Sequence, residues 1–214
     1  MPLRLEELTK EDGELLVKLA RRAVERYVTE FVRVAPPPET PPRLAERAGV
    51  FVTIEKIVRD AAGVPRRVLR GCIGFPEPVY PLVEATIKAS LASAFEDPRF
   101  PPLKRPELSK VVFEVSVLTP PQLIKVSKPT EYPSKIKVGV DGLIVERGFF
   151  RGLLLPQVAV EYGWDEEEFL TQCCLKALLP PDAWLDPHTK VYKFQAEVFE
   201  EEAPEGPVKR RELS

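Results

Sequence analysis

Pairs of strand-like segments separated by short turns recur along this chain, and they constrain its fold more than any other feature. Residues 49–58 and 66–73 are β-branched and apolar, and the short turn between them predicts a hairpin. Segments 110–118 and 190–200 alternate apolar with polar side chains, which is typical of strands with one buried face. Because hairpins pair strands antiparallel, the sequence predicts an α+β fold, mainly antiparallel sheet with flanking helices, and not a doubly wound parallel sheet.

A further hairpin is predicted at Asp141 and Gly142, two residue types that tolerate the positive φ of a type I′ turn. In that register Lys137 would face Glu146 across the strands as an oppositely charged pair. Residues 149–154 would then add a third strand to this part of the chain.

Three amphipathic segments predict helices, and each begins or ends with a recognisable signal. Thr9 is a candidate N-cap of the first helix, and Asp165 of the last, where Trp164 and Phe169 are spaced as a hydrophobic staple. The proline-rich stretch 35–42 predicts a stiff, extended connector, because proline lacks an amide donor and fixes φ. The three predicted helices are residues 10–29, 81–95 and 165–178.

The charge balance of the chain limits its partners. The 31 Lys and Arg residues nearly balance the 33 Asp and Glu residues, so the net charge of -2 gives no basic footprint for nucleic acid. No apolar run approaches the roughly 20 residues of a membrane span, and the N-terminus does not have the pattern of a signal peptide. An odd count of three cysteines then indicates reduced thiols, and the sequence predicts a cytoplasmic protein.

The composition also bears on temperature. The chain contains no Asn, one Met and 24 Pro, which fits a protein from a hot environment, because Asn is thermally labile and Pro stiffens loops. A GC-rich genome is the alternative explanation.

One short motif connects the chain to a known family. Residues 69–74 read LRGCIG, which resembles the signature of the AMMECR family. Four further stretches are similar to the family pattern: DPRFPPL at 97–103, FEVSVLTPP at 113–121, GLLLPQVAVEYGW at 152–164 and FLTQCCLKA at 169–177. The resemblance spans roughly residues 15–198, and the chain departs from it at Leu178, where the family usually carries Gly.

The resemblance implies an architecture. It indicates one AMMECR-like domain over residues 1–200, built from two lobes with a cleft between them. The second lobe, roughly residues 119–188, would be inserted before the final strand, and residues 201–214 would form a polar, frayed tail.

The resemblance does not bring an established reaction with it. Genes of this family often accompany those of Memo-like and radical SAM proteins, which implies a shared pathway. Two functions stay open: a thiol-dependent transferase or hydrolase that acts on a small molecule or nucleotide derivative in the inter-lobe cleft, or a non-enzymatic binding module for a protein or RNA partner. No cofactor is expected.

The candidate nucleophile is Cys72 in the signature. Arg70 lies two residues before it in a predicted strand, so both side chains should share a face, and the guanidinium should favour a thiolate over a thiol of ordinary pKa, about 8.5. Gly71 and Gly74 would leave room for a reactant beside the sulfur. The alternative is that Cys72 is a small buried hydrophobe and that the glycines mark a bulge.

Other residues would complete a substrate site. Arg70 and Arg151 are expected to bind an anionic group, with Gln157 and Glu114 among the substrate contacts. Candidate bases are Glu114, Glu161 and the single histidine, His188, although a solvated or surface position is the favoured explanation of each.

A metal site is not expected. Cys173 and Cys174 are adjacent on a predicted helix, so their side chains point about 100° apart and cannot easily hold one ion. The sequence contains no CxxC or HxxxH spacing and no glycine-rich phosphate loop.

Overall fold

The computed structural model describes residues 3–212, which divide into two compact units. The first unit comprises residues 3–118 and 197–211. Its helices are α1 (Lys10–Glu30) and α2 (Leu82–Phe95), with 3-10 turns η1 (Leu5–Glu7), η2 (Pro42–Ala45) and η3 (Arg105–Lys110). Its strands are β1 (Gly49–Arg59), β2 (Pro65–Phe75), β3 (Val111–Leu118), β8 (Ala196–Glu201) and β9 (Val208–Arg211).

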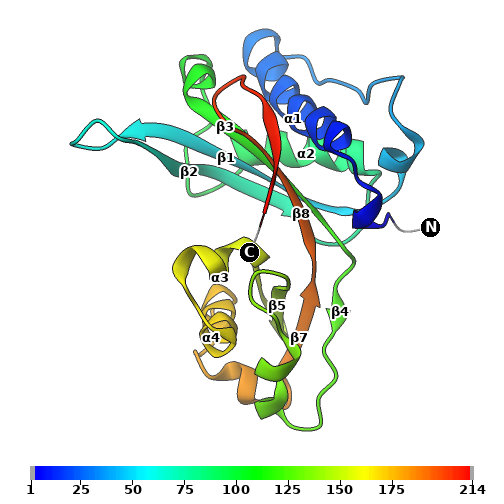
Figure 1. The fold of residues 1–214 in the computed structure, drawn as a ribbon, viewed down its shortest axis with the longest axis vertical. Helices are drawn as coiled ribbons and strands as arrows, with labels where there is room; N and C mark the ends of the chain where they lie inside the picture. Colours follow the sequence, from blue (N-terminus) through cyan, green and yellow to red (C-terminus); the bar gives the residue numbers. More distant parts are fainter. Residues whose placement is uncertain (1–2, 213–214) are drawn as a thin grey trace. The chain divides into compact units, whose positions relative to one another are not determined.

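The five strands of this unit form one sheet in the order β2-β1-β3-β8-β9. Strand β1 pairs antiparallel with both β2 and β3, and α1 and α2 lie over one face of the sheet (Figure 1). Alternate residues of β1, namely Val50, Val52 and Ile54, are fully buried in the core that these helices cover. Helix α2 is apolar almost all round, because it packs against the sheet on one side and α1 on another.

Local polar contacts fix the position of α1. The Thr9 hydroxyl accepts from the Asp12 amide and the Asp12 carboxylate accepts from the Thr9 amide, so the predicted N-cap closes a full capping box. Further along, the buried Arg21 guanidinium donates to both carboxylate oxygens of Glu201 at 2.6 Å. This pair ties α1 to β8 across the core.

The second unit, residues 119–196, has its own sheet and core. Its strands are β4 (Gln122–Leu123), β5 (Gly142–Arg147), β6 (Phe150–Leu154) and β7 (Lys190–Phe194), in the order β4-β7-β5-β6. Its helices are α3 (Pro156–Tyr162) and α4 (Glu166–Lys176), with 3-10 turns η4 (Pro129–Glu131), η5 (Pro133–Lys135) and η6 (Ala183–Leu185). Helix α4 begins as predicted, since the Asp165 carboxylate accepts from the Glu168 amide at 2.8 Å.

The predicted hairpin at Asp141 and Gly142 is wrong. Asp141 instead closes a turn, because its carboxylate accepts from the Lys137 amide at 2.9 Å, and Gly139 supplies the positive φ of 81°. Gly142 starts β5, where the ring of Phe194 lies 2.4 Å from the position of an added Cβ. Glycine is therefore required here for close packing rather than for a turn.

The actual hairpin of this unit joins β5 to β6. Arg147 pairs with Phe150, which leaves Gly148 and Phe149 as a two-residue loop with Gly148 at a φ of 59°. In this register Glu146 faces Arg151 on one side and Lys190 on the other, and not Lys137.

The predicted last strand is in fact two strands in different sheets. The chain leaves β7 and enters β8 at Gln195, whose amide donates to the Thr119 hydroxyl while its carbonyl accepts from the Thr119 amide. Alternation alone could not reveal this break, because the polar-apolar pattern continues through it. The predicted frayed tail is also wrong, since Val208 is buried and β9 pairs with β8.

The mainly antiparallel α+β prediction is confirmed. Within residues 3–212, no helix combines the length and the apolar character that crossing a bilayer requires.

Candidate functional site

The signature residues lie on β2, the edge strand of the first sheet, and a β-bulge interrupts them. Gly71 pairs with Ile54 of β1, whereas the next pair is Leu69 with Glu55, so Arg70 is the extra residue. A bulge breaks the two-residue alternation of a strand and redirects a side chain. The expectation that Arg70 and Cys72 lie side by side on one face depended on that alternation, and it is wrong.

The Arg70 side chain is committed to other partners. Its guanidinium donates to both carboxylate oxygens of Glu107, at 2.9 and 3.1 Å, and to the Pro101 carbonyl at 2.9 Å. The side chain is buried, and the guanidinium lies against the Phe100 ring. Arg70 therefore fastens the edge strand to the segment between α2 and β3.

The backbone of Cys72 is clamped by the DPRF segment that follows α2. The Cys72 amide donates to the Asp97 carboxylate at 2.9 Å, and the Cys72 carbonyl accepts from Arg99 at 3.3 Å. Arg99 and Asp97 also form an ion pair at 2.7 Å, and this pair lowers the pKa of Asp97 to about 2. These contacts satisfy the exposed edge of β2 where the signature lies.

A serine of α2 completes this attachment. The Ser93 hydroxyl accepts from the Ile73 amide at 2.8 Å and donates to the Val52 carbonyl at 2.7 Å. It thereby contacts both strands where Ile73 and Val52 are cross-strand partners. Three successive residues of the signature strand therefore meet α2 or the segment after it: Gly71 and Ile73 lie against Ser93, and Cys72 bonds to Asp97.

The two signature glycines do not clear space for a reactant. A Cβ on Gly71 would lie 2.0 Å from the Ser93 carbonyl oxygen of α2. A Cβ on Gly74 would lie 2.3 Å from the Val50 carbonyl oxygen and 2.4 Å from the Phe51 ring. Protein atoms fill both spaces, so these glycines permit close packing.

The Cys72 thiol faces away from α2, on a row of cross-strand neighbours. Cys72 pairs with Thr53 of β1, and Thr53 pairs with Glu114 of β3, so the three share one face. The thiol is half-buried, and the Thr53 hydroxyl donates to its sulfur at 3.4 Å. Burial raises the pKa of Cys72, an effect that Glu114 and Asp97 reinforce and that Thr53 and Arg99 oppose. The pKa of Cys72 is therefore raised where the sequence predicted it to be lowered, and the guanidinium of Arg70 is bound to Glu107 instead.

The carboxyl group of this row, Glu114, has a strongly perturbed environment. It is buried, and burial raises its pKa to about 7, against the opposing effect of Arg211, whose guanidinium lies 3.1 Å away. A carboxyl group that titrates near neutrality is a candidate proton acceptor. Of the predicted site residues, the structure brings Glu114 and Cys72 onto one face of a single sheet.

The remaining predicted site residues belong to the second unit. Arg151 lies on β6, 3.8 Å from Glu146 of the neighbouring strand, and Gln157 is buried at the start of α3. Glu161 is exposed near the end of α3, and His188 is an exposed loop residue whose ring contacts Asp186 at 2.9 Å. Convergence of Arg151 and Gln157 with Cys72 in one site remains a prediction.

The other two cysteines are part of the second core. Cys173 and Cys174 have no exposed surface, and burial raises the pKa of both thiols, that of Cys174 to about 11. Across residues 3–212, no group of three His, Cys, Asp or Glu side chains is arranged to hold a metal ion.

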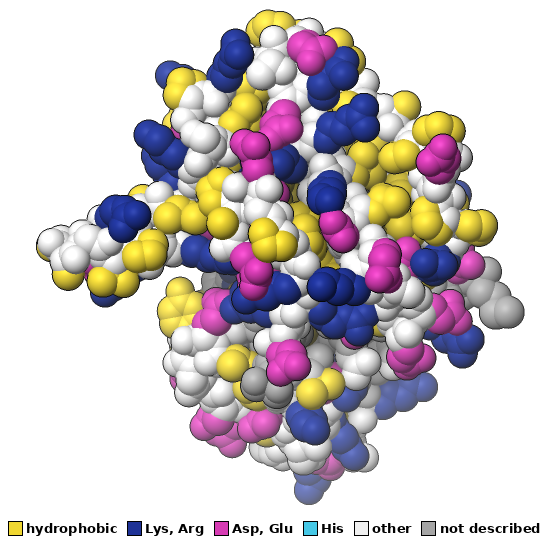
Figure 2. Space-filling model, turned by 45° about the horizontal axis from the view of Figure 1, so that its top comes forward, with side chains coloured by type: hydrophobic (Ala, Val, Ile, Leu, Met, Phe, Trp, Pro, Cys, Tyr) yellow, Lys and Arg dark blue, Asp and Glu magenta, His cyan; other side chains and the backbone are white. Residues whose placement is uncertain are grey.

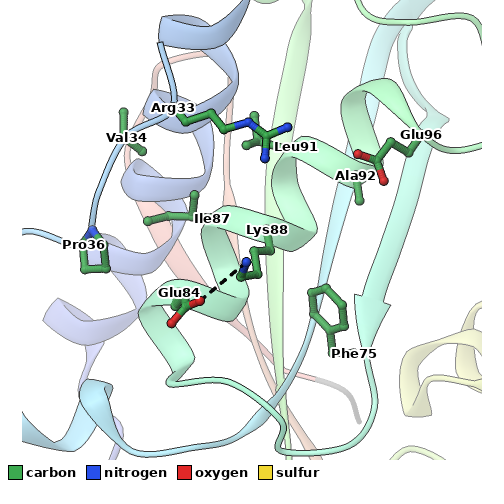
Figure 3. Close-up of a pocket in the computed structure, with 10 residues that line it drawn as sticks. All are labelled: Arg33, Val34, Pro36, Phe75, Glu84, Ile87, Lys88, Leu91, Ala92 and Glu96. Carbon is green, nitrogen blue, oxygen red and sulfur yellow. Dashed lines mark ion pairs between the residues drawn. The ribbon is translucent and has the colours of Figure 1, made fainter.

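A cavity of about 440 Å³ lies on the opposite side of the signature strand, against α2 (Figure 3). Its apolar walls come from Val34 and Pro36 in the segment after α1, Phe75 at the end of β2, and Ile87 and Leu91 of α2. Cys72 does not line it. Sequence reasoning missed this cavity, because its lining comes from three segments that only the fold brings together.

Comparison with known proteins identifies the family. Residues 17–199 match the AMMECR1 family model. Protein PH0010 of Pyrococcus horikoshii is 62% identical over 201 residues, 94% of this chain and 95% of that protein, and a Thermofilum pendens protein is 60% identical over 207 residues, 96% and 97%. The crystal structure of the uncharacterized protein PH0010 has a TM-score of 0.89 at 60% identity and covers 96% of this chain and 98% of its own.

The chain belongs to the AMMECR1 family.

Membership fits the expected thermophilic origin, since relatives such as these come from heat-loving archaea. The relatives' names specify no activity, so the function has to be inferred from the residues and their contacts. In the fold, the LRGCIG and DPRFPPL stretches of the AMMECR1 pattern form one connected structure, joined through Asp97, Arg99 and Arg70. Asp97 and Arg99 were visible in the sequence only as part of a shared stretch, with no signal for this role.

Proposed function

We propose that this AMMECR1 protein is a cytoplasmic binding module and not a thiol-dependent enzyme. The observation that carries the proposal is the state of Cys72: its pKa is raised, and its side-chain hydrogen bond comes from the Thr53 hydroxyl. A nucleophilic thiol needs a lowered pKa or a base within hydrogen-bond reach. Among the described residues, no carboxylate or imidazole makes a hydrogen bond with the Cys72 sulfur.

A surface for a partner is available at the far end of the signature hairpin. The distal parts of β1 and β2 extend as a two-stranded arm, residues 55–69, beyond the helices (Figure 1). Residues 65–69 of β2 are all exposed, whereas the same edge at Cys72 is covered by Asp97 and Arg99, which follow α2. An open strand edge is a template for pairing with another extended chain.

The side chains of the arm indicate the kind of partner. Val64, Val68 and Leu69 are 53%, 49% and 37% exposed, and Figure 2 shows apolar and basic side chains along the projecting arm. The arm contains four Lys or Arg residues, 56, 59, 66 and 67, and two acidic residues, 55 and 60, in a chain whose net charge is -2. We therefore propose as partner an extended protein segment that alternates acidic and apolar side chains. RNA is less suitable, because the arm has no aromatic side chain on which bases could stack.

The state of the thiol is tested by iodoacetamide labelling against pH, with Cys72→Ser as the matched control. Cys173 and Cys174 are buried, so labelling of the folded protein should report Cys72 and vanish in the control. We expect the rate to keep rising beyond about pH 8.5, as for a thiol that is not activated. A plateau below that pH would support the enzyme.

The docking surface is tested with short capped peptides of alternating Glu and Val, compared with Lys and Val peptides and a single-stranded oligouridine. We expect the acidic peptide alone to shift the backbone amide signals of residues 65–69. Arg66→Glu should abolish the shift, and Arg4→Glu, an equally exposed change outside the arm, should not. Binding of oligouridine instead would favour a nucleic-acid function, and equal binding of both peptides would refute the proposed partner.

The enzyme reading keeps one observation in its favour, which is Glu114 with its pKa near 7 on the same face as Cys72. Thr53 lies between them, so proton transfer from the thiol to Glu114 would need an intermediary. If this reading holds, Glu114→Gln should move the pH dependence of Cys72 labelling; an unchanged profile would exclude Glu114 as the base. The expected link to Memo-like and radical SAM proteins stays a prediction under either function.

A further inference from the structure

The cavity beside α2 has the dimensions and walls of a small-molecule site. At about 440 Å³ it lies in the range of roughly 300–1,000 Å³ typical of ligand pockets. Its walls are mainly apolar, with Phe75 on one side and Ile87 and Leu91 on another, so an apolar body would be desolvated on entry. It is a concave feature of the first unit alone and is separate from the arm proposed above.

A cation without a carboxylate partner reaches into this cavity. Arg33 follows the end of α1, which stops where Phe31 takes a φ of 56°, and in Figure 3 its side chain points from the segment after α1 toward α2. In the described part of the chain no carboxylate lies within ion-pair distance of Arg33, and its guanidinium lies 5.7 Å from the centroid of the Tyr27 ring. Arginine offers several donors in a planar fork that matches a carboxylate or phosphate.

Besides Arg33, the lining carries one further cation and two carboxylates. Lys88 of α2 adds a second positive charge, although Glu84 holds it at 3.5 Å and it also lies over the Tyr80 ring. That ion pair leaves Glu84 partly neutralised, and Figure 3 shows Glu84 and Glu96 toward opposite sides of the lining from each other. Lys88 is thus paired with a carboxylate of the same lining, whereas within residues 3–212 no ion pair engages Arg33.

We propose that this cavity binds a small organic anion with an apolar or aromatic body, whose acid group pairs with Arg33 while its body packs on Phe75 and Leu91. The apolar walls supply affinity and the guanidinium selects the charge. This site is independent of the proposed docking arm and of Cys72.

The test uses three probes of one shape: 3-phenylpropionate, its neutral amide and the cationic phenylpropylamine. Binding is followed by amide chemical shifts of the intact protein, with the shifts of Ala92 and Phe75 locating the probe. We expect the anion to bind about tenfold more tightly than the amide, and the amine to be the weakest. An amide that binds as tightly as the acid, or an amine that binds more tightly, would overturn the assignment of charge.

Variants separate the role of Arg33 from general charge effects. Arg33→Gln should reduce affinity for the anion about tenfold and leave the amide unchanged, while Arg33→Lys should retain part of the preference. The matched control is Lys18→Gln, which removes one positive charge from an exposed position on α1 outside the cavity. Equal losses in Arg33→Gln and Lys18→Gln would show nonspecific attraction, and shifts that do not map to the cavity would refute the site. Arg33 is exposed, so these changes are not expected to prevent folding.

Discussion

Gly71→Ala tests the inference that the signature strand is built to lie against α2. The new Cβ would lie 2.0 Å from the Ser93 carbonyl oxygen, which is helix backbone and cannot rotate away. The strand and helix must then separate, which weakens the bond from the Cys72 amide to Asp97 and that from the Ile73 amide to Ser93. Overpacking costs about 1–3 kcal/mol, and each weakened bond about 1 kcal/mol more, so we expect a loss of about 4 kcal/mol.

The measurement is equilibrium unfolding in guanidinium chloride, with Gly63→Ala as the control. Gly63 has a φ of 79° and open space around it, so its substitution should cost only backbone strain, about 1 kcal/mol. A loss in Gly71→Ala no larger than that in Gly63→Ala would refute the structural account of the signature. That result would instead favour the role predicted from the sequence, in which Gly71 leaves room for a ligand beside Cys72.

Two further predictions concern the Asp97 ion pair and the packing of Trp164. Because the pKa of Asp97 is lowered to about 2, its ion pair stabilises the fold above the ordinary carboxyl pKa and is lost as pH falls. Between about pH 5 and pH 2, the wild type should therefore lose about 2 kcal/mol more unfolding free energy than Asp97→Asn. Parallel acid-unfolding curves for the two proteins would contradict this. Trp164→Ala should cost about 2 kcal/mol, since Trp164 stacks on Tyr162 at 4.9 Å and packs against the second core, and an unchanged melting temperature would exclude that contribution.

Local signals in the sequence predicted most of the elements. The capping residues Thr9 and Asp165 located the starts of α1 and α4, because a cap is a contact between residues three apart and needs no knowledge of the fold. Period-two alternation located β3 within one residue, at Val111–Leu118. The errors occurred where a distant contact decides the local conformation.

Gly142 is such a position. An Asp-Gly pair favours a tight turn when nothing else acts on it, but the ring of Phe194 approaches Gly142 from β7, more than fifty residues later. The same limitation applies to Gln195, where one alternating segment is shared between two sheets. Neither the pairing of Gly142 with Phe194 nor that of Gln195 with Thr119 has a local signature.

The bulge at Arg70 shows that a feature set by distant contacts can also change the functional interpretation of the sequence. In an unbroken strand, Arg70 would lie beside Cys72 and favour its thiolate, and the signature would indicate a nucleophile with its activating cation. One extra residue changes that chemistry, since it sends the guanidinium to Glu107 and leaves the thiol against Thr53 with a raised pKa. The bulge, the close approach of Gly71 to Ser93 and the bonds of Cys72 to the DPRF segment all act on the backbone of one edge strand. An edge strand fixed so firmly at its base can hold its distal end out into solvent without pulling away from the sheet. The distinctive residues of the signature are therefore best explained as the anchor of the arm, and the arm, rather than the thiol, is where a partner should be sought.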